Sequence, residues 1–88
     1  DSILGSRVNL GAGTKCANLR FLSGTISIRT EGNKLDTGLR KLGAILGDDC
    51  QTGCNSVTSP GTLLGPESLL LPNVTAASGA HPRKSVLR

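Results

Sequence analysis

Two cysteines and two carboxylates lie close together in the segment GDDCQTGCN, and they raise the first chemical question. Cys50 and Cys54 are four residues apart, and Asp48 and Asp49 precede them. Thiolates and carboxylates at short spacing can bind zinc, and paired thiols can undergo redox exchange. A structural zinc site needs about four ligands, whereas the only histidine, His81, lies far along the chain. We therefore expect no metal site here, and the surrounding repeat must explain these thiols.

The composition favours a thin, repetitive β structure over a compact globule. The 88-residue chain contains one aromatic residue, Phe21, but 12 glycines. Aromatic side chains normally supply much of a small core. The apolar residues here are mainly Leu, Ile, Val and Ala, which bury little area each, so we expect the chain to associate with a partner.

Charge and hydropathy exclude several classes of protein. No apolar run approaches the roughly 18 residues of a membrane span, and the N-terminus shows no signal peptide pattern. We expect a cytoplasmic protein with reduced thiols. The net charge is +4, with basic clusters at Arg40–Lys41 and in residues 81–88. Nucleic-acid binding is not expected, because stacking aromatics and recognition motifs are absent, whereas a basic pocket for a small phosphorylated ligand needs only a few such residues.

A small or apolar residue, of a type that is often buried, recurs every six positions, and we call this position the slot. From residue 46 onward the slot residues are Leu46, Thr52, Thr58, Leu64, Leu70 and Ala76. The same count includes Leu4, Leu10 and Cys16, and Leu4 precedes Leu46 by 42 residues, a multiple of six. A period of six fits neither a helix nor a single long strand, but it is typical of a parallel β-helix. We predict an all-β protein of about three coils, with the slot residues pointing inward.

The repeat also gives an interpretation of the cysteines. Cys16 occupies a slot, and Cys50 falls four places after one, in a second inward position. Both are expected to act as small apolar fillers. Cys54 falls two places after a slot, nearer a corner, so its side chain should diverge from that of Cys50. Asp48 and Asp49 are interpreted as corner residues rather than acid–base catalysts.

One segment interrupts the repeat, and another ends it. Over residues 21–43 the alternation of TISIRT, the turn-like EGN and the returning KLDT predict a hairpin-like excursion from the coil. After Ala77 the repeat is expected to fade into a basic tail over residues 77–88. We interpret residues 1–88 as one β-helix domain. Because the chain begins inside the pattern without a cap, we expect it to be a fragment of a longer protein.

The segments VNLGAGTKCANLR and KLGAILGDDCQTGCN resemble the C-terminal domain of bifunctional sugar-1-phosphate nucleotidyltransferases. This family includes bacterial enzymes that combine glucosamine-1-phosphate acetyltransferase and N-acetylglucosamine-1-phosphate uridyltransferase activities. The resemblance implies a left-handed parallel β-helix that forms a homotrimer, and the hand rests on the resemblance alone, because left-handed crossovers are unusual. In the family, a separate N-terminal domain transfers a nucleotide to a sugar phosphate. The β-helix domain, where active, acetylates an amino-sugar phosphate with acetyl-CoA.

The resemblance also implies roles for five residues. Asn9 and Asn18 match asparagines on the sugar side of the site, and Lys41 matches a phosphate-contacting lysine. Cys54 replaces a serine at the cofactor site, and Arg83 (or the later Arg88) corresponds to a tail arginine near the phosphates of coenzyme A.

The residues themselves leave other readings open. Asn9 and Asn18 could each hydrogen-bond the backbone of their own corners, and Lys41 could simply be solvated. Acetyl transfer also needs a base, and the family's catalytic histidine lies upstream of this chain; His81 does not match it. No catalytic residue is therefore assigned. The alternative function is a non-catalytic trimerisation or regulatory domain that binds a nucleotide-sugar, and we expect the isolated chain to be a trimer with little or no acetyltransferase activity.

Overall fold

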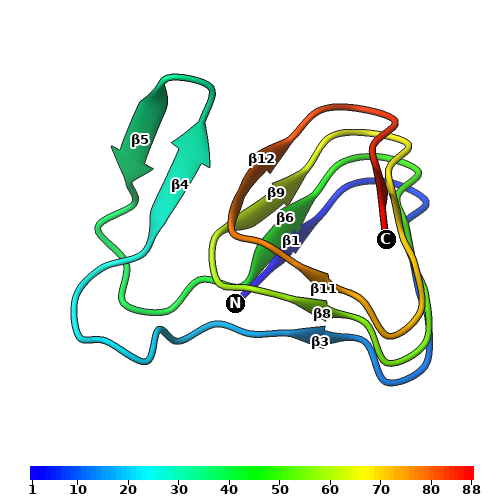
Figure 1. Ribbon diagram of the computed structural model, residues 1–88, viewed down its shortest axis with the longest axis horizontal. Coiled ribbons are helices and arrows are strands. Elements are labelled where there is room, and N and C mark those ends of the chain that lie inside the picture. The colour runs from blue at the N-terminus through cyan, green and yellow to red at the C-terminus, as the bar shows by residue number, and fades with distance from the viewer.

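The computed structural model describes residues 1–88, and short strands stack around a three-sided coil (Figure 1). The first sheet contains β1 (Ile3–Leu4), β6 (Ala44–Leu46), β9 (Thr62–Leu64) and β12 (Gly79–His81). The second contains β2 (Asn9–Leu10), β7 (Gln51–Thr52), β10 (Leu69–Leu70) and β13 (Val86–Leu87). The third contains β3 (Lys15–Cys16), β8 (Val57–Thr58) and β11 (Thr75–Ala76). All pairings within these sheets are parallel, which confirms the predicted parallel β-helix. None of the segments forms a helix long and apolar enough to cross a bilayer.

The register stacks slot residues in columns. Leu4 pairs with Leu46, and Leu46 pairs with Leu64, so the predicted count of 42 residues across the excursion is confirmed. Leu46, Leu64 and Leu70 are at most 1% exposed, as inward side chains must be. Leu4 and Leu10 are 45% and 41% exposed because they lie in the outermost coil. Burial of these columns is the main apolar contribution of the coil.

The corners of the coil depend on a residue with a left-handed backbone, three places after the slot; the exception is the slot Cys16, after which the excursion leaves the coil. Besides glycines, the residues with this conformation are Arg7, Asp49, Asn55, Glu67, Asn73 and Lys84. In two corners Pro66 precedes Glu67 and Pro72 precedes Asn73, with φ of 64° and 60° at the second residue of each pair. Proline followed by a positive φ is the arrangement of a type II turn, so these pairs encode sharp corners.

The chain continues the coil beyond Ala77, where the sequence predicted that the repeat would fade. β12 pairs with β9, and β13 pairs with β10. Leu46 and its partner Leu64 are 18 residues apart, whereas Leu64 and its partner His81 are only 17 apart. One residue is therefore missing from the corner before β12. A strict count of six passes over His81 and Leu87, although both continue the slot columns.

The excursion is a two-stranded antiparallel hairpin that leaves the coil after β3 and returns at β6 (Figure 1). Its strands are β4 (Ser27–Thr30) and β5 (Asn33–Asp36). Thr30 pairs with Asn33, so the turn contains two residues and Asn33 belongs to the strand rather than to the predicted turn. Gly32 has a φ of +75°, which this turn requires.

A small second core holds the excursion against the first sheet. It consists of Ile26, Ile28 and Leu42, packed against the outward side chains Ile45 and Leu63. The three excursion residues are at most 7% exposed. The excursion is thus a packed part of the molecule, and it places a fixed wall beside the coil.

Candidate functional site: a basic cleft beside the excursion

The larger of two clefts, with a volume of about 570 Å³, lies between the excursion and the third sheet. One wall is formed by residues 19–22 and by the hairpin, and the other by Val57, Ser59 and Pro60 at the end of β8. The second core fixes the hairpin, and the parallel pairing of β8 fixes the opposite wall. The folding of the chain therefore forms this cleft from segments that are distant in sequence.

The charge of the cleft is entirely positive. Its lining includes Arg20, Arg29 and Lys34, and it includes no Asp, Glu or His. Arg29 and Lys34 are direct partners across the hairpin, where like charges destabilise the pairing. Neither cation is neutralised, because the ion pairs of the chain are Arg7 with Asp49 and Arg83 with Glu67. Such a site attracts an anion, whose binding would relieve the repulsion.

Arg20 contributes a partly oriented guanidinium group. Its Nη1 donates a hydrogen bond to the carbonyl of Thr25 at 2.9 Å. The remaining N–H groups of the guanidinium fork have no hydrogen-bond partner in the chain. A guanidinium with free donors can bind a phosphate through two parallel hydrogen bonds. Arg20 is thus well suited to bind a phosphate group.

Apolar side chains complete the cleft. Leu19, Phe21 and Leu22 come from the excursion, and Val57 and Pro60 come from the coil. Phe21, the only aromatic residue, is fully exposed. Small-molecule sites combine apolar walls with a few oriented polar groups. The arrangement therefore suits a small ligand with an anionic group and a less polar face.

Two of the residues implied by the resemblance meet at the base of the excursion. Leu19 bridges to Lys41, and the carbonyl of Asn18 accepts a hydrogen bond from the backbone N–H of Leu42 at 3.0 Å. Asn18 also stands between Ala17 and Leu19, which line the cleft. Its Nδ2 donates to Asp1 Oδ2 at 2.7 Å, so the carboxamide bonds a carboxylate rather than its own corner. Asn18 and Lys41 thus flank the basic cleft.

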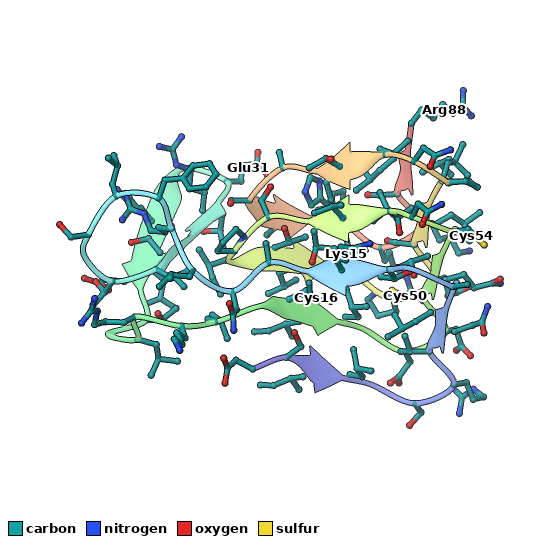
Figure 2. All side chains as sticks on the ribbon, turned by 90° about the horizontal axis from the view of Figure 1, so that it is seen from below. Lys15, Cys16, Glu31, Cys50, Cys54 and Arg88 are labelled. Carbon is teal, nitrogen blue, oxygen red and sulfur yellow. The ribbon has the colours of Figure 1, made fainter.

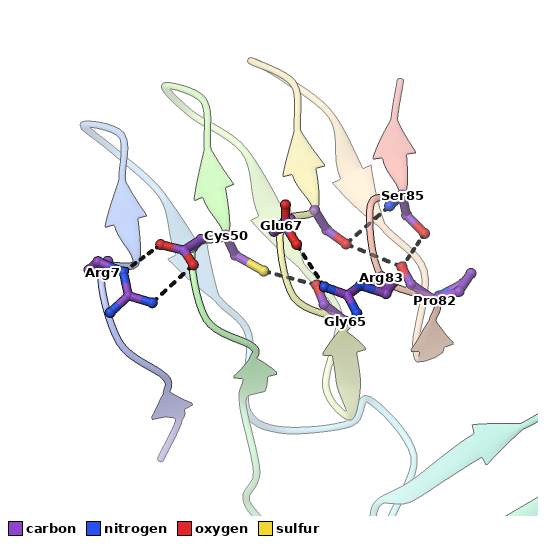
Figure 3. Close-up of polar contacts among 9 residues, drawn as sticks. Arg7, Cys50, Gly65, Glu67, Pro82, Arg83 and Ser85 are labelled. Atoms are coloured by element: carbon purple, nitrogen blue, oxygen red, sulfur yellow. Dashed lines mark hydrogen bonds and ion pairs between the residues drawn. The ribbon is translucent and has the colours of Figure 1, made fainter.

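The other three implied residues lie elsewhere on the coil, outside the cleft lining. Asn9 is exposed in β2 of the second sheet, and Cys54 is exposed at the corner that follows β7. Arg83 lies at the corner after β12, where its Nη2 donates to Glu67 Oε1 at 2.7 Å (Figure 3). A single chain therefore does not join Asn9, Cys54 and Arg83 with Asn18 and Lys41 in one pocket.

The cysteines diverge as predicted. Cys50 is fully buried, and its Sγ lies 3.2 Å from the carbonyl oxygen of Gly65 (Figure 3). Cys54 is exposed on the side of the coil that lies farthest from the excursion, whereas Cys16 lies nearer the middle (Figure 2). All three thiols are free.

Two carboxyl groups have perturbed acidities, and each has a local cause. Hydrogen bonds from the Thr25 hydroxyl and then from the Gly38 N–H lower the pKa of Asp36. The hydrogen bond and charge of Arg7 lower the pKa of Asp49. Asp36 is linked to the cleft because Thr25, whose hydroxyl donates to Asp36, also accepts a hydrogen bond from Arg20 through its carbonyl.

The sequence interpretation missed the three cleft cations. Arg20 follows the matched Asn18 by two residues, but it was read only as part of the motif. Arg29 and Lys34 could have been found from the sequence, because a hairpin with its turn at EG places these two cations opposite each other. Like charges in this position destabilise a hairpin, so their presence indicates a role in binding.

Comparisons with known proteins confirm the resemblance. The chain is 39% identical over 72 residues, 82% of its length, to the bifunctional sugar-1-phosphate nucleotidylyltransferase/acetyltransferase of Sulfurisphaera tokodaii. It is 39% identical over 70 residues to the bifunctional protein GlmU of Methanococcus vannielii and 31% identical over 74 residues to YaiX, an uncharacterized acetyltransferase of Escherichia coli. The chain spans only 18% and 17% of the first two proteins and 32% of the third. No protein-family model matches the chain.

Proposed function

We propose that the chain is the β-helix part of an acetyl-CoA-dependent sugar-phosphate acyltransferase, and that its basic cleft binds the phosphate of an amino-sugar phosphate. The observation that carries the proposal is the set of three cations in the cleft, Arg20, Arg29 and Lys34, with no carboxylate in its lining. Asn18 and Lys41 flank this cleft. The similarity to a sugar-1-phosphate nucleotidylyltransferase/acetyltransferase supports the class of substrate.

Each group then has a distinct task. Arg20, Arg29 and Lys34 bind the phosphate, and its fixed position orients the sugar amine. Asn18 supplies a carboxamide beside the sugar, and Lys41 adds a further cation. When bound, acetyl-CoA supplies the thioester acetyl group that the amine accepts, with release of the thiol.

The proposal includes a homotrimer with a left-handed coil. The residues assigned to coenzyme A, Cys54 and Arg83, lie outside the cleft on separate corners of one chain. Neighbouring copies would allow a corner of one chain to face the cleft of another. Arg83 would then exchange its exposed Glu67 partner for a phosphate of coenzyme A, at little cost because surface ion pairs contribute little.

One observation favours a second candidate, a non-catalytic binding or trimerisation domain. The cleft lining contains no carboxylate or imidazole that could take a proton from the amine. The only imidazole belongs to His81, whose Nε2 lies 2.9 Å from the carbonyl of Ala77. Under this alternative the cleft binds a sugar phosphate or nucleotide-sugar without turnover.

Calorimetric titration with glucosamine-1-phosphate tests the proposal. The double variant Arg29→Ala/Lys34→Ala should bind at least about tenfold more weakly, because hydrogen bonds to charged groups are lost. The same variant should be at least as stable as the wild type, because it removes opposed like charges. Lys84→Ala/Arg88→Ala is the control that removes the same number of charges; neither residue lines the cleft, and Arg88 lies far from the excursion (Figure 2). Equal affinity of the Arg29→Ala/Lys34→Ala variant and the wild type would refute the assignment, and an acetyl-CoA turnover assay would separate the two candidates.

A further inference from the structure

We propose that Asp36 is a positioning residue of the basic cleft, acting on Arg20 through Thr25; this inference rests on the proposed function of the cleft. Asp36 is the last residue of β5. Its Oδ1 accepts hydrogen bonds from Thr25 Oγ1 at 2.7 Å and from the backbone N–H of Gly38 at 2.9 Å. One carboxylate oxygen thus joins the segment before β4 to the segment after β5, at the base of the hairpin.

Thr25 connects this carboxylate to the cleft. Its hydroxyl donates to Asp36, and its carbonyl accepts from Arg20 Nη1 at 2.9 Å. Thr25 makes no other hydrogen bond, but the N–H of Ile26, which belongs to the same peptide group as the Thr25 carbonyl, donates to the carbonyl of Leu39 at 2.8 Å. The Thr25 carbonyl is therefore held in two ways, by the backbone bond from Ile26 to Leu39 and, through the Thr25 hydroxyl, by Asp36.

Arg20 depends on that carbonyl in turn. It begins the exposed loop over residues 20–24, and its bond to Thr25 is the only hydrogen bond of its side chain. An arginine side chain that is free in solution must lose much rotamer entropy when it binds a ligand. A guanidinium already held toward the cleft loses less, so the relay from Asp36 raises the affinity for an anion.

The sign of the effect separates positioning from simple electrostatics. Asp36 is a negative charge near a site that we expect to bind an anion. If only its charge mattered, removing it would strengthen binding. If Asp36 positions Arg20, removing its acceptor oxygen weakens binding even though a repulsive charge has disappeared. The hydrogen bonds from Thr25 and Gly38 favour the charged form of Asp36 and so lower its pKa.

Three variants, each of which removes one negative charge from the hairpin, distinguish positioning from simple electrostatics. Asp36→Asn keeps an Oδ1 that can accept both hydrogen bonds, whereas Asp36→Ala does not. Glu31→Gln neutralises a carboxylate in the hairpin turn that makes no hydrogen bond. Calorimetric titration with glucosamine-1-phosphate should show binding about three- to tenfold weaker for Asp36→Ala, the value of one or two hydrogen bonds. Asp36→Asn and Glu31→Gln should bind within about twofold of the wild type or more tightly.

A double-mutant cycle with Arg20→Ala completes the test, with thermal unfolding to confirm that each variant is folded. In the Arg20→Ala background, Asp36→Ala should have no further effect on affinity. The proposal is overturned if Asp36→Ala binds as tightly as Asp36→Asn, or if its loss persists without Arg20.

A parallel titration with inorganic pyrophosphate separates this proposal from the function. If the wild type binds pyrophosphate but not the sugar phosphate, the substrate assignment fails, and the pyrophosphate series still decides the role of Asp36. If the wild type binds neither, both proposals are wrong.

Discussion

Replacing Thr58 by valine should stabilise the protein, because its hydroxyl is buried without a partner. Thr58 is a fully buried slot residue of the third sheet, stacked between Cys16 and Ala76. Its Oγ1 is the one buried side-chain oxygen or nitrogen that makes no hydrogen bond. An unsatisfied buried hydroxyl costs about 1–3 kcal/mol. Valine keeps the β-branched shape and removes the polar atom, so we expect Thr58→Val to raise the free energy of unfolding by about 1–2 kcal/mol.

Thr62→Val is the matched control. Thr62 is also fully buried, but its Oγ1 donates to the carbonyl of Ser59 at 2.7 Å. Its replacement should lower the stability by about 1 kcal/mol. For a domain of this size, 1 kcal/mol shifts Tm by about 4–8 °C, which calorimetry or circular dichroism resolves. All chains must be compared at one concentration, because association changes Tm. A lower Tm for Thr58→Val than for the wild type would refute the reasoning.

Two further perturbations follow from the corners of the coil. A Cβ at Gly53 would clash with the backbone nitrogen and the ring of Pro72 in the next coil, so Gly53→Ala should lower the free energy of unfolding by about 1–3 kcal/mol in a urea titration; an unchanged midpoint would show that these coils do not approach so closely. Asp49, whose pKa is lowered by Arg7, stabilises the fold above the carboxyl pKa of the unfolded chain, and this contribution is lost as the pH falls through the lowered value. Asp49→Asn should therefore lose less stability than the wild type as the pH falls below about 5, and parallel losses would contradict this role of the ion pair.

Much of the fold could be predicted because buried residues of similar type recur every six positions in the sequence. Leu46, Leu64 and Leu70 recur at a spacing that only stacked coils bury together, and the register bears this out. The continuation through His81 and Leu87 was not predictable by counting, since one residue is missing from a corner and His81 is an unusual inward residue.

The site could be predicted only in part. Asn18 and Lys41 are 23 positions apart, yet both match the resemblance, and the neck of the excursion brings them to the same place. Arg20, Arg29 and Lys34 form one cleft only because the hairpin folds beside the third sheet. That placement depends on the packing of Ile26 and Ile28 against the first sheet, which no local pattern encodes.

An NMR titration of the ¹⁵N-labelled chain with glucosamine-1-phosphate tests most directly whether the cleft binds an anion. Because a bound ligand would contact the lining of the cleft, we predict amide shift changes in residues 19–22, at Arg29 and Lys34, and at Val57 and Ser59. The smaller hollow over residues 69–72, on the second sheet, should not respond. Shift changes confined to that hollow, or no saturable change at all, would contradict the assignment of the cleft as an anion-binding site.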